Sequence, residues 1–157
     1  MKVTLAVIGK TEVSFVRQGI EEYVKRLSRY VPFSIRYIAD VKGTRNMDEA
    51  RQKEAEGRAL LQVIGAGDYV VLLDEHGTER TSVDFAAWLQ RRMASGGKQL
   101  VFVVGGPYGF SPKVHDRADE EISLSRMTLP HELVRLVFVE QLYRAFTILR
   151  HEPYHHE

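Results

Sequence analysis

Short apolar runs alternate with stretches of helical periodicity along this chain. Three runs, 3–8, 69–73 and 99–104, are rich in β-branched and apolar residues, which is typical of strands covered on both faces of a sheet. Residues 33–39 alternate in polarity and 121–125 form a shorter run, so both are predicted to be strands. The whole pattern predicts an α/β fold: a mostly parallel sheet with helices on both faces.

Helical patterns separate these strands. Apolar side chains recur at helical spacing over 13–27, and a charged, weakly periodic stretch predicts a second helix over 47–58. Ser82 is predicted to cap a third helix, and Pro112 to open a short fourth one. A long final helix is predicted over 130–150.

The polar segments between these elements are predicted to be loops. Residues 74–80 follow the third strand as a polar loop, and the glycine-rich run 105–109 follows the fourth as a tight one. Thr128 and Pro130 precede the final helix. A capping hydroxyl followed by a ring without an N–H is a typical start for a helix.

The final helix is apolar around nearly its whole circumference. Such a helix is buried on more than one side, so in a small domain the extra face is predicted to meet a second copy of the chain. Glu140 and Arg144 lie four residues apart on this helix. They form either a surface ion pair, worth a few tenths of a kcal/mol, or part of a site.

Composition narrows the function classes. With 157 residues, 44% of them apolar, the chain is predicted to be a single globular domain over 1–157. A net charge of +1 argues against tight nonspecific binding to nucleic acid, but not against a structured RNA recognised on a small patch. The absence of cysteine excludes disulfides and thiolate chemistry. No signal peptide or membrane span is evident, so a soluble, cytoplasmic protein is predicted.

Several known catalytic and binding motifs are matched only in part or not at all. Residues 151–155 read His-Glu-Pro-Tyr-His, but Pro153 would break the helix that a zinc-binding pair of histidines needs, so no metal site is predicted. No Gly-x-Ser-x-Gly elbow supports a serine hydrolase. The glycines of 105–109 match neither a dinucleotide fingerprint nor a phosphate-binding loop; they indicate either a ligand site at a strand end or a simple turn.

The chain resembles a known family at several separate motifs. These are 124–131 (Leu-Ser-Arg-Met-Thr-Leu-Pro-His), 140–144, 153–155, 104–109 and 73–77. Together they are similar to the ribosomal RNA large-subunit pseudouridine methyltransferase family, of the SPOUT class of S-adenosylmethionine-dependent enzymes. The similarity covers essentially the whole chain, and the 124–131 segment with the Pro-Tyr-His tail is its most specific part.

This resemblance implies a fold, a cofactor and a partner. Its members have a deep C-terminal trefoil knot, work as homodimers and methylate N3 of a pseudouridine in large-subunit ribosomal RNA on the assembled ribosome. S-adenosylmethionine would sit in the knot. The residues implied to hold it are Leu73, Gly105, Leu124, Ser125, Arg126, Met127, Thr128 and Leu129.

Catalytic candidates come from the same comparison and from the cluster of titratable groups near the C-terminus. Attack by an imide nitrogen requires removal of its proton, which a positioned base or a nearby cation assists. His131, Tyr154 and His155 are candidates for proton handling, and Arg135 and Arg144 for binding phosphate or developing charge. The simpler alternatives are a helix cap for His131 and a salt bridge in the dimer for Arg135.

Two other functions stay open from the sequence. One is a SPOUT enzyme that acts on transfer RNA or on another ribosomal RNA position. The other is a non-catalytic module that binds RNA or a nucleotide. One departure from the family pattern is His151, which stands where many relatives are expected to have glycine, and it puts the bend of the tail in doubt.

Overall fold

A five-stranded sheet forms the centre of the part of the chain that the structure describes, which is residues 1–41 and 43–156 of a computed structural model. The strands lie in the order β2-β1-β4-β3-β5, and every pairing between neighbours is parallel. Their bounds are β1 (Lys2–Ile8), β2 (Phe33–Ile38), β3 (Tyr69–Glu79), β4 (Gln99–Val104) and β5 (Glu120–Ser123). The predicted α/β class and parallel sheet are therefore confirmed.

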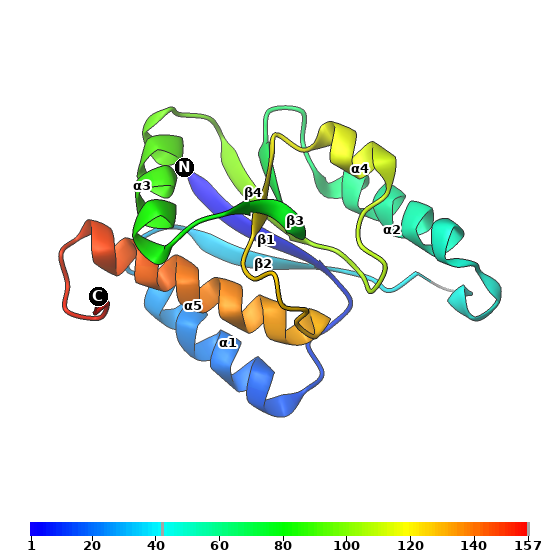
Figure 1. The fold of residues 1–157 in the computed structure, drawn as a ribbon, viewed down its shortest axis with the longest axis horizontal. Coiled ribbons are helices and arrows are strands. Elements are labelled where there is room, and N and C mark those ends of the chain that lie inside the picture. Colours follow the sequence, from blue (N-terminus) through cyan, green and yellow to red (C-terminus); the bar gives the residue numbers. More distant parts are fainter. Residues whose placement is uncertain (42, 157) are drawn as a thin grey trace.

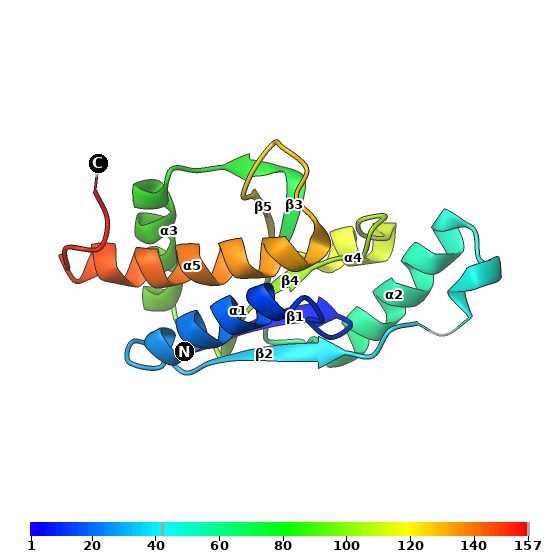
Figure 2. The ribbon, with the colours of Figure 1, turned by 90° about the horizontal axis from the view of Figure 1, so that it is seen from below.

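The helices cover both faces of this sheet (Figures 1 and 2). They are α1 (Ser14–Leu27), α2 (Glu49–Val63), α3 (Ser82–Ala94), α4 (Pro112–Arg117) and α5 (His131–Leu149), with a short 3₁₀ turn, η1 (Thr44–Asn46). One core cluster joins the sheet to α1, α3 and α5, and a second joins its other face to α2 and α4. Along β4, Leu100 and Phe102 belong to the first cluster and Val101 and Val103 to the second, because successive strand residues face opposite sides.

Helix α5 lies against both α1 and α3. At Gly19 of α1 a methyl group would stand 2.8 Å from Cδ1 of Leu136, so the absent side chain lets the two helices approach closely. Phe138, Val139 and Leu142 are fully buried on the sheet side of α5. No helix within the described ranges is long and apolar enough to cross a membrane.

The predicted polar loop 74–80 is wrong. Strand β3 continues to Glu79, and after a register shift between Leu73 and Thr78 it pairs again with β5, Thr78 opposite Ile122. This second half has no apolar run because it projects past the core, and five of the six residues from Asp74 to Glu79 are polar or charged. Backbone pairing with β5, which hydropathy does not report, extends the strand.

Several predicted element ends also shift. Thr81, not Ser82, caps α3, and its hydroxyl accepts a hydrogen bond from the Asp84 amide at 3.0 Å. Helix α2 runs to Val63 rather than 58, and the last strand ends two residues earlier than expected, at Ser123. Pro130 itself occupies the N-cap position of α5, so Thr128 does not cap that helix.

The end of α5 explains the expectation of glycine at position 151. His151 has φ +57°, the left-handed conformation that favours glycine. Its amide donates to the Ile148 carbonyl, and the Glu152 amide donates to the Thr147 carbonyl at 2.9 Å. These two bonds form a Schellman motif, which ends the helix and turns the chain back along it. Residues 151–155 are accordingly not helical.

Candidate functional site

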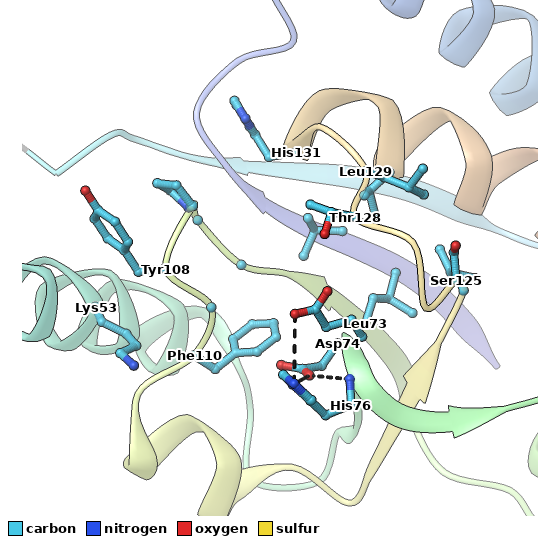
Figure 3. Close-up of a pocket in the computed structure, with 18 of the residues that line it drawn as sticks. Lys53, Leu73, Asp74, His76, Tyr108, Phe110, Ser125, Thr128, Leu129 and His131 are labelled. Carbon is cyan, nitrogen blue, oxygen red and sulfur yellow. Dashed lines mark hydrogen bonds and ion pairs between the residues drawn. The ribbon is translucent and has the colours of Figure 1, made fainter.

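The main cavity lies beside residues 73–76 of β3 and the carboxyl ends of β4 and β5. It has a volume of about 670 Å³, within the range that holds a nucleoside-sized ligand. In a parallel sheet the carboxyl ends of neighbouring strands share one edge, and open α/β sheets bind ligands there. Seven of the eight residues expected to hold a methyl donor line it: Leu73, Gly105, Leu124, Ser125, Met127, Thr128 and Leu129. Figure 3 shows four of them around the hollow, with His131 at its edge.

Arg126 is the exception among these eight. Its side chain is 81% exposed and forms an ion pair with Glu79 at 3.5 Å, on the extended half of β3. It is absent from the lining of the cavity. A contact between Arg126 and a bound donor would therefore involve its backbone rather than its guanidinium group.

The turn at 124–129 is shaped by its own serines. The Ser123 hydroxyl donates to the Ser125 carbonyl at 3.0 Å, and the Ser125 hydroxyl accepts from the Met127 amide at 2.9 Å. Such local bonds between side chain and backbone hold an irregular segment in place. Met127 itself is 79% exposed, which leaves an apolar side chain at the mouth of the cavity.

The glycine-rich loop forms the opposite wall. Gly106 and Gly109 pair across a tight turn through an amide-to-carbonyl bond of 3.2 Å, and Gly109 has φ +80°. A methyl group at Gly105 would touch the Phe110 ring at 3.0 Å, and one at Gly106 would collide with both carboxylate oxygens of Glu56. The glycines therefore serve both the turn and a close approach of α2.

A cluster of polar side chains lies at the cavity, and Asp74, His76 and His115 of this cluster line it. Asp74 accepts a hydrogen bond from the His76 amide at 2.8 Å, and His115 pairs with Glu121 at 2.9 Å. Asp74, His115 and Glu121 also place their possible ligand atoms within 4.8 Å of one another. Each of these side chains already has a hydrogen-bond partner in the protein. These hydrogen bonds are enough to explain why the three side chains lie close together.

The predicted catalytic tail forms a separate cluster. Glu140 accepts hydrogen bonds from Tyr154 at 3.0 Å and from Arg144 at 2.6 and 3.0 Å. Arg144 also contacts Nδ1 of His155 at 3.0 Å, and the Tyr154 hydroxyl lies 3.2 Å from that of Tyr23. Glu140 and Arg144 are thus part of a network and not an isolated surface pair.

Tyr154 is held as a neutral phenol. Burial, followed by the hydrogen bonds to Tyr23 and Glu140, raises the pKa of Tyr154 well above its ordinary value. At neutral pH its hydroxyl donates a hydrogen bond and keeps its proton. In this arrangement Tyr154 is suited to orienting a group by hydrogen bonding, and it is not suited to acting as a phenolate base.

The tail cluster and the cavity lie at opposite ends of α5. His131 begins the helix beside the cavity, whereas Arg144 lies thirteen residues further along, about 20 Å at 1.5 Å per residue. Figure 1 shows the C-terminus at the end of α5 far from the loop that follows β4. One chain therefore does not bring Tyr154, His155 and Arg144 to the cavity.

Arg135 occupies a third position, inside the protein. It is 1% exposed and donates to the carbonyls of Ile8 and Gly9 and to the Thr11 hydroxyl, at 2.7, 3.0 and 3.0 Å. Glu132, one turn earlier, accepts from the amides of Glu12 and Val13 at 2.9 and 3.0 Å. The first turn of α5 thereby fixes the connection between β1 and α1.

Sequence reasoning missed the contribution of α2. Glu49 and Lys53 line the cavity, as do Tyr108 and His115, and Glu56 lies behind Gly106. The weak periodicity of α2 gave no reason to connect it with a site. The only available signal was a charged residue at 56, one turn before the apolar Leu60 on the same side of the helix.

Comparisons with known proteins show which family the chain resembles. A family model described as "Predicted SPOUT methyltransferase" matches residues 1–155. Proteins named ribosomal RNA large subunit methyltransferase H match the chain from end to end. The protein from Parabacteroides distasonis is 53% identical over 157 residues, that from Porphyromonas gingivalis 51% and that from Flavobacterium johnsoniae 50%, with 100% of both chains covered in each case.

Proposed function

The chain belongs to the SPOUT methyltransferase family, and on that premise we propose that it methylates N3 of a pseudouridine in large-subunit ribosomal RNA, with S-adenosylmethionine as donor. Relatives about 50% identical over the full length bear the name of a large-subunit ribosomal RNA methyltransferase. The observation that carries the proposal is that one cavity gathers seven of the eight expected donor-binding residues. A ribosomal substrate makes the cytoplasm the proposed compartment.

The cavity fits the donor in size and chemistry. A nucleoside with an amino-acid tail fits within about 670 Å³, and Leu73, Leu124 and Leu129 offer apolar surface to an adenine ring. The irregular backbone of 124–129 offers amide and carbonyl groups that no sheet or helix uses. When bound, the donor supplies an activated methyl group on a sulfonium. The protein's part is to align that methyl with the attacking nitrogen and to exclude water.

We propose that the same segments form a trefoil knot. The returning segment 124–129 and the loop 105–109 wall one cavity from opposite sides, although β5 lies beyond β3 at the edge of the sheet. In a trefoil knot the end of the chain passes through a loop formed by an earlier segment, and a return of the chain past the loop 105–109 is compatible with such a path. Knots are rare among folds, so hydrophobic periodicity alone argues against one.

We also propose a homodimer that completes the active site. Along α5, Arg144 of the tail cluster lies about 20 Å from His131 at the cavity of its own chain, whereas a two-fold related copy packed antiparallel along α5 would bring the tail and the cavity together. The partly exposed apolar residues Leu133 and Val137 on α5 and the 66% exposed Phe15 on α1 provide surface for such a partner.

Within that dimer the side chains take complementary roles. Tyr154 would shift the hydrogen bond that it donates to Glu140 onto a carbonyl of the target base, and Arg144 would stabilise the negative charge that develops when the imide proton leaves. His155 and His131 are the groups placed to accept that proton. Arg135, which is buried against the backbone, would act by holding the helix that carries His131.

The test is transfer of labelled methyl from S-adenosylmethionine to ribosomes that lack the modification, beside free ribosomal RNA and transfer RNA. Label on the large-subunit RNA of intact ribosomes supports the proposal. Label on transfer RNA would show that the substrate is a transfer RNA and would leave the proposed donor unchanged. Binding of the donor with no transfer to any RNA would contradict the substrate assignment.

One substitution distinguishes the role of the C-terminal tail in turnover from the role of the cavity in donor binding. Tyr154→Phe should lower turnover at least about tenfold, because one oriented hydrogen bond is lost, while donor affinity stays unchanged. Loss of donor affinity in this variant would instead show that Tyr154 supports the fold. Mixed dimers of Tyr154→Phe chains with chains disabled in the cavity should recover one working site if the two halves come from different subunits.

A further inference from the structure

Helix α2 contributes a wall of the cavity that neither the sequence motifs nor the family resemblance includes. Glu49, Lys53 and Glu56 are spaced i, i+4 and i+7, so they lie on one side of the helix. Glu49 and Lys53 line the cavity, and Glu56 lies deeper, behind Gly106 of the glycine-rich loop. Figure 3 shows Lys53 extending from α2.

Lys53 lines the cavity, and no acidic side chain within the described residues forms an ion pair with it. Two acidic residues on its own helix, Glu49 and Glu56, stand at pairing distance in sequence, and yet the ion pair found on α2 joins Glu54 to Arg58. Among the described residues Lys53 has no hydrogen bond or ion pair, although it is half-buried. A half-buried ammonium group that lines a cavity is placed to bind a negatively charged part of a ligand.

Glu56 is a buried acidic side chain with few polar partners. It is 5% exposed, and within the described residues its Oε1 has no hydrogen-bond partner, while Oε2 has only a long contact of 3.5 Å with the Gln52 amide group. Asp40 and His131 are the other titratable groups close enough to act on it electrostatically. A buried carboxylate with so little compensation lacks a positive partner.

Lys53 and Glu56 together favour a ligand that carries both a negative and a positive group. They lie three residues apart on one helix, one lining the cavity and the other separated from it by a glycine. A ribose, a base or a phosphate would satisfy Lys53 at most. An α-amino acid carries a carboxylate and an ammonium group on one carbon, and so it complements both.

We propose that Lys53 and Glu56 form the subsite for the amino-acid end of the methyl donor. Lys53 binds its α-carboxylate, and Glu56 supplies negative charge for its α-ammonium group across Gly106. The inference rests on the proposed function, because it takes S-adenosylmethionine as the occupant of the cavity. It adds α2 to the segments 73, 105 and 124–129 as a determinant of donor binding.

Two ligands that differ only at this end provide the test. S-adenosylhomocysteine keeps the amino acid, and 5′-methylthioadenosine lacks it. Calorimetric titration of the full-length protein should show that Lys53→Met and Glu56→Gln each weaken S-adenosylhomocysteine about tenfold and leave methylthioadenosine unchanged. Unchanged binding of the smaller ligand also shows that each variant has folded. Lys98→Met and Glu54→Gln, at exposed positions, are the matched controls and should alter neither affinity.

The outcomes separate the subsite from the proposed function. Equal weakening of both ligands would make the two residues structural and overturn the subsite. Unchanged affinity for both, with weaker ribosome binding in Lys53→Met, would assign Lys53 to an RNA phosphate and also overturn it. If the wild-type protein bound neither ligand, the proposed donor itself would be wrong.

Discussion

Arg135→Met tests whether this arginine is part of the chemistry or of the framework. The guanidinium group makes three hydrogen bonds, to Ile8, Gly9 and Thr11, and burial lowers the pKa of Arg135 below its ordinary value. Methionine keeps most of the aliphatic volume and removes all five N–H donors. The two carbonyls at the end of β1 would then lose buried partners.

The expected cost follows from these contacts. At about 1 kcal/mol net per hydrogen bond, three bonds give about 3 kcal/mol. That is a large part of the roughly 5–15 kcal/mol by which a domain is stable. For a chain of this size it corresponds to a fall of about 6–12 °C in Tm. Arg135→Lys keeps the charge, but a single ammonium group does not span all three acceptors, so about half of the loss is expected.

Urea unfolding followed by fluorescence and circular dichroism, at fixed protomer concentration, measures this cost. Arg29→Met, at an exposed position near the end of α1, is the control and should change stability by less than about 0.5 kcal/mol. The folded Arg135→Met protein should still bind the donor. A variant as stable as wild type that had lost methyl transfer a hundredfold would refute the framework role and favour a catalytic one.

Three further substitutions are expected to change the stability of the protein in a definite direction. His151→Gly should stabilise the protein by about 0.5–1 kcal/mol, seen as a higher urea midpoint, because glycine adopts the φ of +57° without strain. The Val13 and Glu12 amides lower the pKa of Glu132, so Glu132→Gln should be less stable than wild type at pH 7, with a difference that vanishes as the pH falls below the lowered value. Burial raises the pKa of Glu56, so Glu56→Gln should be the more stable protein at pH 7, by about 1 kcal/mol, with a difference that disappears as the pH falls toward 4.5. Unfolding curves at pH 7, at pH 4.5 and at the lowest pH at which the protein still folds check both. A Glu132→Gln difference that stays the same at the lowest pH, or a Glu56→Gln difference as large at pH 4.5 as at pH 7, would contradict the reasoning.

Much of the fold follows from local patterns. Continuous apolar runs such as Gln99–Val104 identified buried strands, because both faces of this sheet are covered. The extension of β3 beyond Leu73 could not be predicted in this way, since it depends on pairing with β5, a partner about 45 residues away in sequence. The start of α5 was predicted within one residue, but its cap was predicted wrongly, because Thr128 has the chemistry of a cap and lies instead in the cavity wall.

Some residues of the candidate site could also be predicted from the sequence, and others could not. Residues 124–129 stand together in sequence, so the motif that suggested a donor site already contained most of one wall. Tyr154 and His155 were assigned to the same chemistry, but only the three-dimensional path of α5 reveals that their own chain keeps them away from the cavity. Lys53 and Glu56 could not be found in advance, because their importance arises from contact with a loop fifty residues downstream.

The order of the strands also governs how this chain is completed during synthesis. Strand β1, the first element made, has β4 as its inner neighbour, with Lys2 opposite Gln99. Until β4 has left the ribosome, β1 can pair only with β2, and its other edge stays open. Arg135, which bonds to the end of β1, emerges later still. The nascent chain therefore carries an unpaired apolar edge through most of its translation, and its folding is expected to be late, slow and dependent on protection from aggregation.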